Sequence, residues 1–124
     1  MEKKKKVLVI DDEPHILKLV DYILSKEGFE VIQGYVGQEA IKKAEYDKPD
    51  LIILDVMMPN LDGFETARIL KSNKETKHIP IIFLSAKTRF EDEIRGFDSG
   101  AADYIKKPFE PDYLIEKVKE HILK

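Results

Sequence analysis

Short apolar runs alternate with amphipathic segments five times along this chain of 124 residues. The run Leu51–Leu54 is apolar throughout, as a strand buried on both faces is, whereas Pro14–Lys26 carries apolar residues at helical spacing. Gly28 follows that segment in the way that a glycine ends a helix. Strands that alternate with helices form a parallel sheet with helices on both faces. The sequence therefore predicts one α/β domain of the doubly wound class.

The alternation also gives the ranges of the elements. The predicted strands are Val7–Ile10, Glu30–Gln33, Leu51–Leu54, Ile79–Leu84 (interrupted by Pro80) and Asp103–Lys106. The predicted helices are Pro14–Lys26, Gly37–Tyr46, Gly63–Ser72, Phe90–Ser99 and Asp112–Leu123. The fourth of these helices contains Ile94 and Phe97 as apolar residues and ends before Gly100.

Composition excludes several classes of protein. The chain has no cysteine, which excludes disulfides and thiolate chemistry. No apolar run approaches the ~20 residues of a membrane span, and Val7–Ile10 is too short for the apolar part of a signal peptide. The net charge of -3 gives no bias toward nucleic acid. We expect a cytoplasmic protein that binds neither membranes nor nucleic acid directly.

Polar side chains follow four of the predicted strands at the point where each strand ends. These residues are Asp11 and Asp12 after the first strand, Asp55 after the third, Ser85 after the fourth and Lys107 after the fifth. The carboxyl ends of parallel strands meet at one edge of the sheet, where doubly wound folds bind ligands. We therefore expect these side chains to share one pocket.

Asp11 and Asp12 are candidate ligands of a metal ion. Adjacent carboxylates repel each other, so two of them beside Asp55 need a compensating cation, and Mg²⁺ prefers such oxygen ligands. The alternative interpretation is that Asp12 caps a helix that begins near Glu13 and Pro14. Both interpretations stay open, because one does not exclude the other.

Asp55 is a candidate nucleophile, because a carboxylate at the end of a buried strand can form an acyl phosphate. The hydroxyl of Ser85 can then bond a phosphoryl oxygen, and the ammonium of Lys107 can neutralise the carboxylates and pair with phosphate. Strand alternation places Lys106 on the opposite face. Pro108 fixes the local turn and can make the bond after Lys107 cis. Each residue also has a purely structural interpretation. Asp55 can hydrogen-bond to the turn that follows it, Ser85 can cap the next helix or turn, and Lys107 can be an ordinary surface lysine.

These residues lie in four segments: Val7–Pro14, Leu51–Gly63, Pro80–Ala86 and Gly100–Phe109. With these segments in this order, the chain resembles the receiver domain of bacterial two-component response regulators, in particular those of chemotaxis. The resemblance covers residues 1–124. It implies a flavodoxin-like, doubly wound five-stranded parallel sheet with strand order 2-1-3-4-5.

The resemblance implies that Asp55 accepts a phosphoryl group from a phosphohistidine of a sensor histidine kinase or phosphotransfer protein. Asp11, Asp12 and Asp55, with the backbone carbonyl of Met57, would hold Mg²⁺, and Mn²⁺ is able to substitute. Lys107 would bind a phosphoryl oxygen. The domain would promote only its own phosphorylation and dephosphorylation, and would not otherwise be an enzyme.

Ser85 and Tyr104 are the switch residues that the resemblance implies. Ser85 would move toward the phosphoryl group and Tyr104 would rotate into the vacated space, although Tyr104 can also be an ordinary strand aromatic. The surface of the fourth helix, fifth strand and fifth helix would then control an effector protein or domain. A phosphorylation-dependent homodimer stays open, but Tyr113 and Lys117 depart from the pattern of regulators with winged-helix outputs.

Met57 and Lys87 occupy the two positions that, in this family, affect the water that hydrolyses the acyl phosphate. An apolar Met57 cannot orient water, and Lys87 cannot accept a hydrogen bond while it is protonated. The resemblance therefore predicts self-dephosphorylation over minutes or longer.

Three other functions compete with the phosphorylated switch. A phosphohydrolase that uses an aspartyl phosphate needs a second carboxylate two residues after its nucleophile, where this chain has Met57. A flavodoxin-like cofactor module needs a phosphate-binding loop, but Asp11, Asp12 and Glu13 would repel phosphate without a metal. A receiver that binds partners without phosphorylation usually lacks the acceptor aspartate or the lysine, and both are present here.

Overall fold

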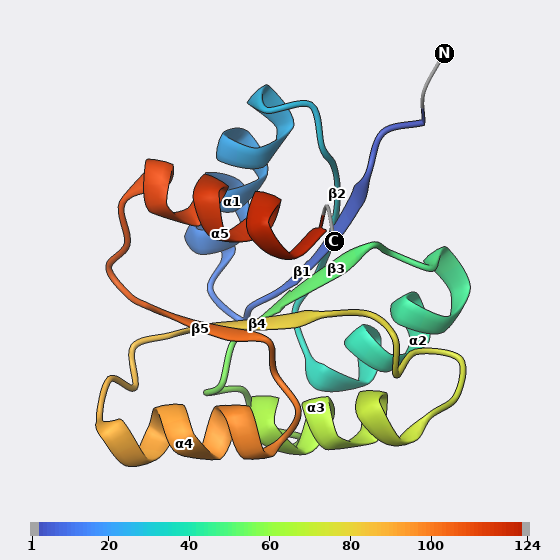
Figure 1. Cartoon of the computed structure of the whole chain (residues 1–124), viewed down its shortest axis with the longest axis vertical. Helices are drawn as coiled ribbons and strands as arrows, with labels where there is room; N and C mark the ends of the chain where they lie inside the picture. The colour runs from blue at the N-terminus through green and yellow to red at the C-terminus, as the bar shows by residue number, and fades with distance from the viewer. Residues whose placement is uncertain (1–2, 123–124) are drawn as a thin grey trace.

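The computed structural model describes residues 3–122 and confirms the predicted architecture (Figure 1). Within these residues, one parallel sheet has the strand order β2-β1-β3-β4-β5, as the family resemblance implied. The strands are β1 (Lys6–Ile10), β2 (Glu30–Gly34), β3 (Leu51–Leu54), β4 (Ile81–Ser85) and β5 (Asp103–Lys106). The helices are α1 (Pro14–Lys26), α2 (Gly37–Asp47), α3 (Gly63–Ser72), α4 (Phe90–Asp98) and α5 (Pro111–Ile122).

Helices cover both faces of the sheet and enclose two apolar cores. Figure 1 shows α1 and α5 on one face and α2, α3 and α4 on the other. Alternate residues of the central strands enter opposite cores, so Val9 and Ile53 pack under α1 and α5 while Ile10 and Leu54 pack under α2 and α3. The strands that carry the polar residues are therefore held rigidly from both sides.

Most predicted bounds agree with the structure to within one residue, but the start of the fourth strand differs by two residues and the end predicted for the last helix lies beyond the described residues. The fourth strand begins at Ile81, two residues later than predicted, because Pro80 has no N–H to donate to the sheet. The carbonyl of Pro80 still accepts a hydrogen bond from the N–H of Ile52 at 3.0 Å. Leu123, predicted as the last residue of α5, lies outside the described residues. Gly28 follows α1 with a φ of +92°, as a helix-ending glycine does.

The apolar side chains of α4 do not enter the core. Ile94 is 44% exposed and Phe97 is 49% exposed, whereas Asp92 and Gly96 are the buried residues of this helix. The ring of Tyr104 lies against Gly96, where a Cβ would stand 2.9 Å from the ring. The helix therefore packs through its backbone at Gly96 and turns its large apolar residues to the surface.

None of the helices within residues 3–122 has the length and apolar character that crossing a bilayer requires.

Candidate functional site at the carboxyl edge of the sheet

The register of the strands brings the predicted site residues to one edge of the sheet. Ile10 pairs with Leu54, so the residues that follow them, Asp11 and Asp55, lie side by side. The N–H of Asp55 donates to the carbonyl of Ile10 at 2.9 Å. Both carboxylates are nearly inaccessible, with 1% of Asp11 and 4% of Asp55 exposed. Oxygens of Asp11, Asp12 and Asp55 lie within 4.8 Å of one another, so the predicted carboxylate cluster is confirmed.

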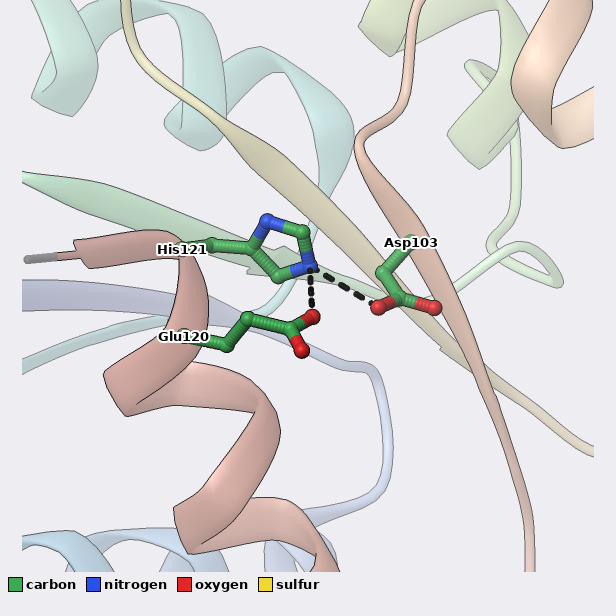
Figure 2. A group of neighbouring side chains, drawn as sticks. All are labelled: Asp103, Glu120 and His121. Atoms are coloured by element: carbon green, nitrogen blue, oxygen red, sulfur yellow. Dashed lines mark hydrogen bonds and ion pairs between the residues drawn. The ribbon is translucent and has the colours of Figure 1, made fainter. Parts of the chain in front are cut away.

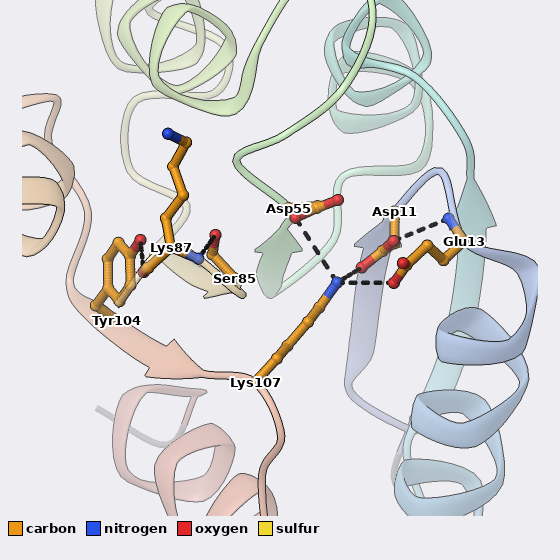
Figure 3. Close-up of polar contacts among 7 residues, drawn as sticks. All are labelled: Asp11, Glu13, Asp55, Ser85, Lys87, Tyr104 and Lys107. Atoms are coloured by element: carbon orange, nitrogen blue, oxygen red, sulfur yellow. Dashed lines mark hydrogen bonds and ion pairs between the residues drawn. The ribbon is translucent and has the colours of Figure 1, made fainter. Parts of the chain in front are cut away.

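Lys107 reaches into this cluster from the end of β5 (Figure 3). Its ammonium lies 2.8 Å from Asp11 Oδ2, 3.3 Å from Glu13 Oε2 and 3.7 Å from Asp55 Oδ1. Burial lowers the pKa of Lys107, but the hydrogen bond to Asp11 and the charge of Asp55 raise it to above its ordinary value. Lys107 is therefore a charged group at neutral pH. The bond from Lys107 to Pro108 is cis.

Lys106 points to a different part of the molecule, as strand alternation predicted. Its ammonium lies 3.2 Å from Glu93 of α4. The two adjacent lysines therefore have separate partners, and only Lys107 serves the carboxylate cluster.

The cluster holds more negative than positive charge, and burial together with this imbalance raises the pKa of Asp55. Burial and the nearby negative charge of Asp11 raise the pKa of Asp55 from 3.8 to about 7, although Lys107 and a hydrogen bond from the Met57 backbone act against this shift. One ammonium faces three carboxylates. A hard divalent cation with oxygen ligands fits this set of donors, because it would supply the missing positive charge.

The N-terminus of α1 is not capped by Asp12, so that interpretation is wrong. The helix starts at Pro14, and the capping position is Glu13, whose side chain makes no capping hydrogen bond. The N–H of Glu13 instead donates to Asp11 Oδ1 at 2.9 Å. Because the helix begins one residue too late for Asp12 to cap it, the exposed carboxylate of Asp12 stays available to the cluster.

The loop after Asp55 is held in place by Gly63 and by a helix cap. A Cβ at Gly63 would overlap the carbonyl oxygen of Asp55, so only glycine allows this close approach. The next helix starts with a capping box, in which Asp62 accepts from the N–H of Glu65 at 2.9 Å and the Glu65 side chain accepts from the N–H of Asp62 at 3.2 Å. The sequence interpretation identified this turn but not the cap.

Ser85, Lys87 and Tyr104 form a second set of contacts on the other side of Asp55 (Figure 3). The hydroxyl oxygen of Ser85 accepts from the N–H of Lys87 at 3.0 Å, and the hydroxyl of Tyr104 donates to the carbonyl of Lys87 at 2.6 Å. The Tyr104 ring is 5% exposed and lies 5.9 Å from the ring of Phe83. The structure therefore has Tyr104 in the inward position, and its rotation on phosphorylation stays a prediction.

The two residues predicted to affect hydrolysis, Met57 and Lys87, line a common cleft of about 390 Å³ beside the site. Met57 is 56% exposed and, with Asp55 and Lys107, lines a cleft of about 230 Å³. The ammonium of Lys87 points away from Asp55 and Ser85 in Figure 3. Lys87 thus contacts the site through its backbone rather than through its charge.

Glu13 is a site residue to which the sequence interpretation gave no role. It lines the same cleft and contacts Lys107 from the first turn of α1. Its signal in the sequence is the unbroken acidic triplet Asp11, Asp12 and Glu13, of which the family resemblance assigns a metal-binding role only to the first two.

Comparison with known proteins agrees with this geometry. The family described as the response regulator receiver domain matches residues 7–119. The alkaline phosphatase synthesis transcriptional regulatory protein PhoP of Bacillus subtilis is 47% identical over 115 residues, which are 93% of this chain and 47% of that protein. The phosphate regulon transcriptional regulatory protein PhoB of Klebsiella pneumoniae is 36% identical over 93% of this chain and 50% of its own length. The chain therefore spans about half the length of these relatives.

Solved structures show the same fold. The chemotaxis protein CheY4 of Vibrio cholerae superimposes with a TM-score of 0.90 at 34% identity, over 96% of this chain and 99% of that one. The receiver domain of the sensor histidine kinase PA1611 from Pseudomonas aeruginosa PAO1 has a TM-score of 0.91 at 26% identity, over 98% and 100% of the two chains, and that structure holds a magnesium ion in its active site cleft. On the match over residues 7–119 and these relatives, the chain belongs to the family of response regulator receiver domains.

Proposed function

We propose that this receiver domain, spanning residues 1–124, is a phosphorylation-activated signalling switch whose phosphoryl acceptor is Asp55. The observation that carries the proposal is the unbalanced cluster: the carboxylates of Asp11, Asp12 and Asp55 lie together, and the single ammonium of Lys107 contacts two of them, Asp11 and Asp55. A site with this charge deficit suits a divalent cation and a reaction in which negative charge moves.

Asp11, Asp12 and Asp55, with the backbone carbonyl of Met57, are the groups that would hold Mg²⁺, or Mn²⁺ in its place. Their donor atoms are oxygens, which these hard cations prefer. When bound, the ion would shield the carboxylates from the incoming phosphoryl group and stabilise the charge on its oxygens.

The phosphoryl transfer can be written with a role for each residue of the site. A carboxylate oxygen of Asp55 attacks the phosphorus of a phosphohistidine on a sensor kinase or phosphotransfer protein. The new P–O bond forms as the P–N bond breaks, and the leaving imidazole takes the electron pair and then a proton. Lys107 binds a phosphoryl oxygen, and the Ser85 hydroxyl donates to another. The domain promotes this transfer and the later hydrolysis on itself alone.

Lys87 and Tyr104 provide a path from the site to the outer surface. When Ser85 turns toward a phosphoryl group, its contact with the Lys87 N–H is lost, and the carbonyl of Lys87 is the group that holds the Tyr104 hydroxyl. The Tyr104 ring packs against α4 at Gly96, and this helix carries the apolar residues Phe90 and Phe97, which are 76% and 49% exposed. We propose that this α4–β5–α5 surface controls the effector.

The effector and the location of the protein follow from the relatives rather than from the site. The named relatives are transcriptional regulators of about twice this length, so a DNA-binding domain outside residues 7–119 is one candidate effector. A separate partner protein is the other candidate, and a phosphorylation-dependent homodimer is compatible with either. We propose a cytoplasmic location, where sensor kinases present their phosphohistidines.

Met57 supports a long-lived phosphorylated state. A thioether beside the cleft offers no strong hydrogen bond to a water that attacks the acyl phosphate. The Lys87 ammonium points away from Asp55, so it does not orient that water either (Figure 3). The phosphorylated protein should therefore decay over minutes or longer in the presence of Mg²⁺.

The test is the intact mass after incubation with acetyl phosphate and Mg²⁺. Wild-type protein should gain a single phosphoryl group, and the gain should disappear in Asp55→Asn and without the metal. Asp50→Asn is the matched control, because it also removes one aspartate carboxylate but lies at the opposite end of the sheet, where Asp50 bonds the N–H of Lys6. If folded wild-type protein gains no phosphoryl group, a phosphorylation-independent interaction module becomes the better function.

A further inference from the structure

Lys107 has a third carboxylate partner that lies outside the carboxylate cluster. Glu13 Oε2 is 3.3 Å from the Lys107 ammonium, closer than Asp55 Oδ1 at 3.7 Å. Unlike Asp11 and Asp55, the Glu13 side chain is half exposed at 49%. Glu13 thus holds the same ammonium from the solvent side of the cleft that Lys107 lines.

The backbone of Glu13 is fixed although its side chain is partly in water. Its N–H donates to Asp11 Oδ1 at 2.9 Å, and the following Pro14 begins α1. The side chain therefore leaves a rigid point next to the cluster. Its carboxylate is not among the three whose oxygens lie within 4.8 Å of one another, so Glu13 is placed to bind Lys107 rather than a metal ion.

A metal ion and a phosphoryl group would make opposite demands on Lys107. A divalent cation needs the oxygens of Asp11 and Asp55 that Lys107 now contacts, and it repels the ammonium. A phosphoryl group on Asp55 needs the ammonium back as a partner. Lys107 must therefore leave its two buried carboxylates in the first step and stay within reach for the second.

We propose that Glu13 is a positioning residue that retains Lys107 when a metal ion takes over Asp11 and Asp55, and that it releases Lys107 to the phosphoryl group. This inference rests on the proposed function, because it assigns a role within the same site. Glu13 favours metal binding by offering Lys107 another partner. It opposes phosphoryl binding by competing for the same ammonium.

Two titrations of the metal-free protein test this role, both followed by NMR of the backbone amides near Asp55. The first adds Mg²⁺ alone, and the second adds beryllofluoride, a phosphoryl analogue, at saturating Mg²⁺. In Glu13→Gln, affinity for Mg²⁺ should fall and affinity for beryllofluoride should rise, each by about two- to five-fold, since the lost ion pair is partly exposed.

Two further variants separate contact from charge. Glu27→Gln is the matched control, because Glu27 stands at the other end of α1 and also pairs with a lysine of a later element, Lys119, at 3.0 Å. Both affinities should stay at wild-type values in this variant. Glu13→Asp keeps the charge but shortens the side chain by one methylene, so it should shift both affinities in the same directions as Glu13→Gln.

The outcomes distinguish this inference from the proposed function. If Glu13→Gln or Glu13→Asp binds Mg²⁺ and beryllofluoride with the affinities of the wild-type protein, the role of the Glu13 contact is overturned. The proposed phosphorylated switch would be unaffected by that result. Wild-type protein that binds neither Mg²⁺ nor beryllofluoride would overturn both. Opposite shifts in the two titrations, seen in Glu13→Gln and Glu13→Asp but not in Glu27→Gln, would support the inference.

Discussion

Two clusters of carboxylates and basic side chains lie at opposite ends of the strands, and they differ in how well the carboxylates are partnered. At the carboxyl edge, one lysine faces three aspartates, and the pKa of Asp55 is raised to about 7. At the other end, Asp103 and Glu120 face two basic side chains, Lys117 and His121. Figure 2 shows the contacts of His121 with both carboxylates. The residue types are similar, but the pKa of Asp55 is raised in the first cluster, whereas the pKa of Asp103 is lowered in the second.

In the second cluster, the carboxylate of Asp103 has hydrogen-bond and ion-pair partners for both of its oxygens. Asp103 Oδ2 lies 2.8 Å from His121 Nε2 and 3.5 Å from Lys117, and Asp103 Oδ1 accepts from the N–H of Tyr104 at 2.9 Å. Burial alone would raise the pKa of Asp103, but these partners lower it to below its ordinary value. The same chain therefore partners the carboxylate of Asp103 with side chains that join α5 to β5, and leaves the carboxylate of Asp55 poorly partnered at the site where we propose phosphoryl transfer.

Replacing Asp55 should give the largest effect on stability. In metal-free buffer at pH 8, Asp55→Asn should raise the free energy of unfolding by about 2–4 kcal/mol, because it removes a buried charge that its neighbours repel. The folded pKa of about 7 exceeds the ordinary 3.8, so the stability that Asp55 contributes below pH 4 is lost as the pH rises toward 7. Urea unfolding should show the two proteins converging near pH 4. If Asp55→Asn is no more stable than the wild-type protein at pH 8, then the neighbouring carboxylates do not destabilise the charged Asp55 as proposed.

Replacing Asp103 should act in the opposite direction. Asp103→Asn should lower the free energy of unfolding by about 1–2 kcal/mol near neutral pH, because His121 and Lys117 lose a charged partner. Its folded pKa is lowered, so this contribution is present above the unfolded pKa and is lost as the pH falls through the folded one. The same urea experiment measures it. A loss that persists unchanged in acid would show that the ion pairs are not its cause.

Mg²⁺ should stabilise the protein through the first cluster alone. At ten times its dissociation constant, a ligand that binds only the folded state adds about 1.4 kcal/mol to the free energy of unfolding. The gain should shrink in Asp12→Asn and remain in His121→Ala, as measured by thermal unfolding with and without the ion. A gain that depends on His121 would mean that the second cluster also binds the metal.

Glu120 should give the smallest effect. Its side chain is 47% exposed, and its contacts with His121 and Lys117 are 3.2 and 3.6 Å long. Glu120→Gln should therefore change the free energy of unfolding by less than about 0.5 kcal/mol. If Glu120→Gln lowers the free energy of unfolding as much as Asp103→Asn does, then Glu120 rather than Asp103 provides the stability of the second cluster.

Much of the fold could be predicted because local pattern and global packing agree. Leu51–Leu54 and Gly63–Ser72 match their predicted bounds, since an all-apolar run and a turn glycine leave few alternatives. The Phe90–Asp98 helix was predicted as an element, but the burial of its residues was not. Which face of that helix packs depends on the Tyr104 ring against Gly96, a contact between residues of different elements.

The candidate site could be predicted to the same extent and for the same reason. Asp11, Asp55 and Lys107 each follow a strand, so the topology alone brings them together. Glu13 was missed because it stands at the start of α1 rather than directly after a strand, so only its side-chain geometry brings it to Lys107. The pairing of His121 with Asp103 was missed likewise, because a helix end and a strand start meet only in the folded chain.

Carbon-13 NMR of the aspartate carboxyl groups tests the contrast between the two clusters most directly. In one metal-free sample, titrated from acid to mild base, Asp55 should titrate near pH 7 and Asp103 below the ordinary aspartate value. Added Mg²⁺ should move the midpoint of Asp55 down and leave that of Asp103 in place. An Asp55 that titrates with the ordinary aspartates near 3.8, and that does not respond to Mg²⁺, would contradict the account of an unbalanced site built to receive a metal ion and a phosphoryl group.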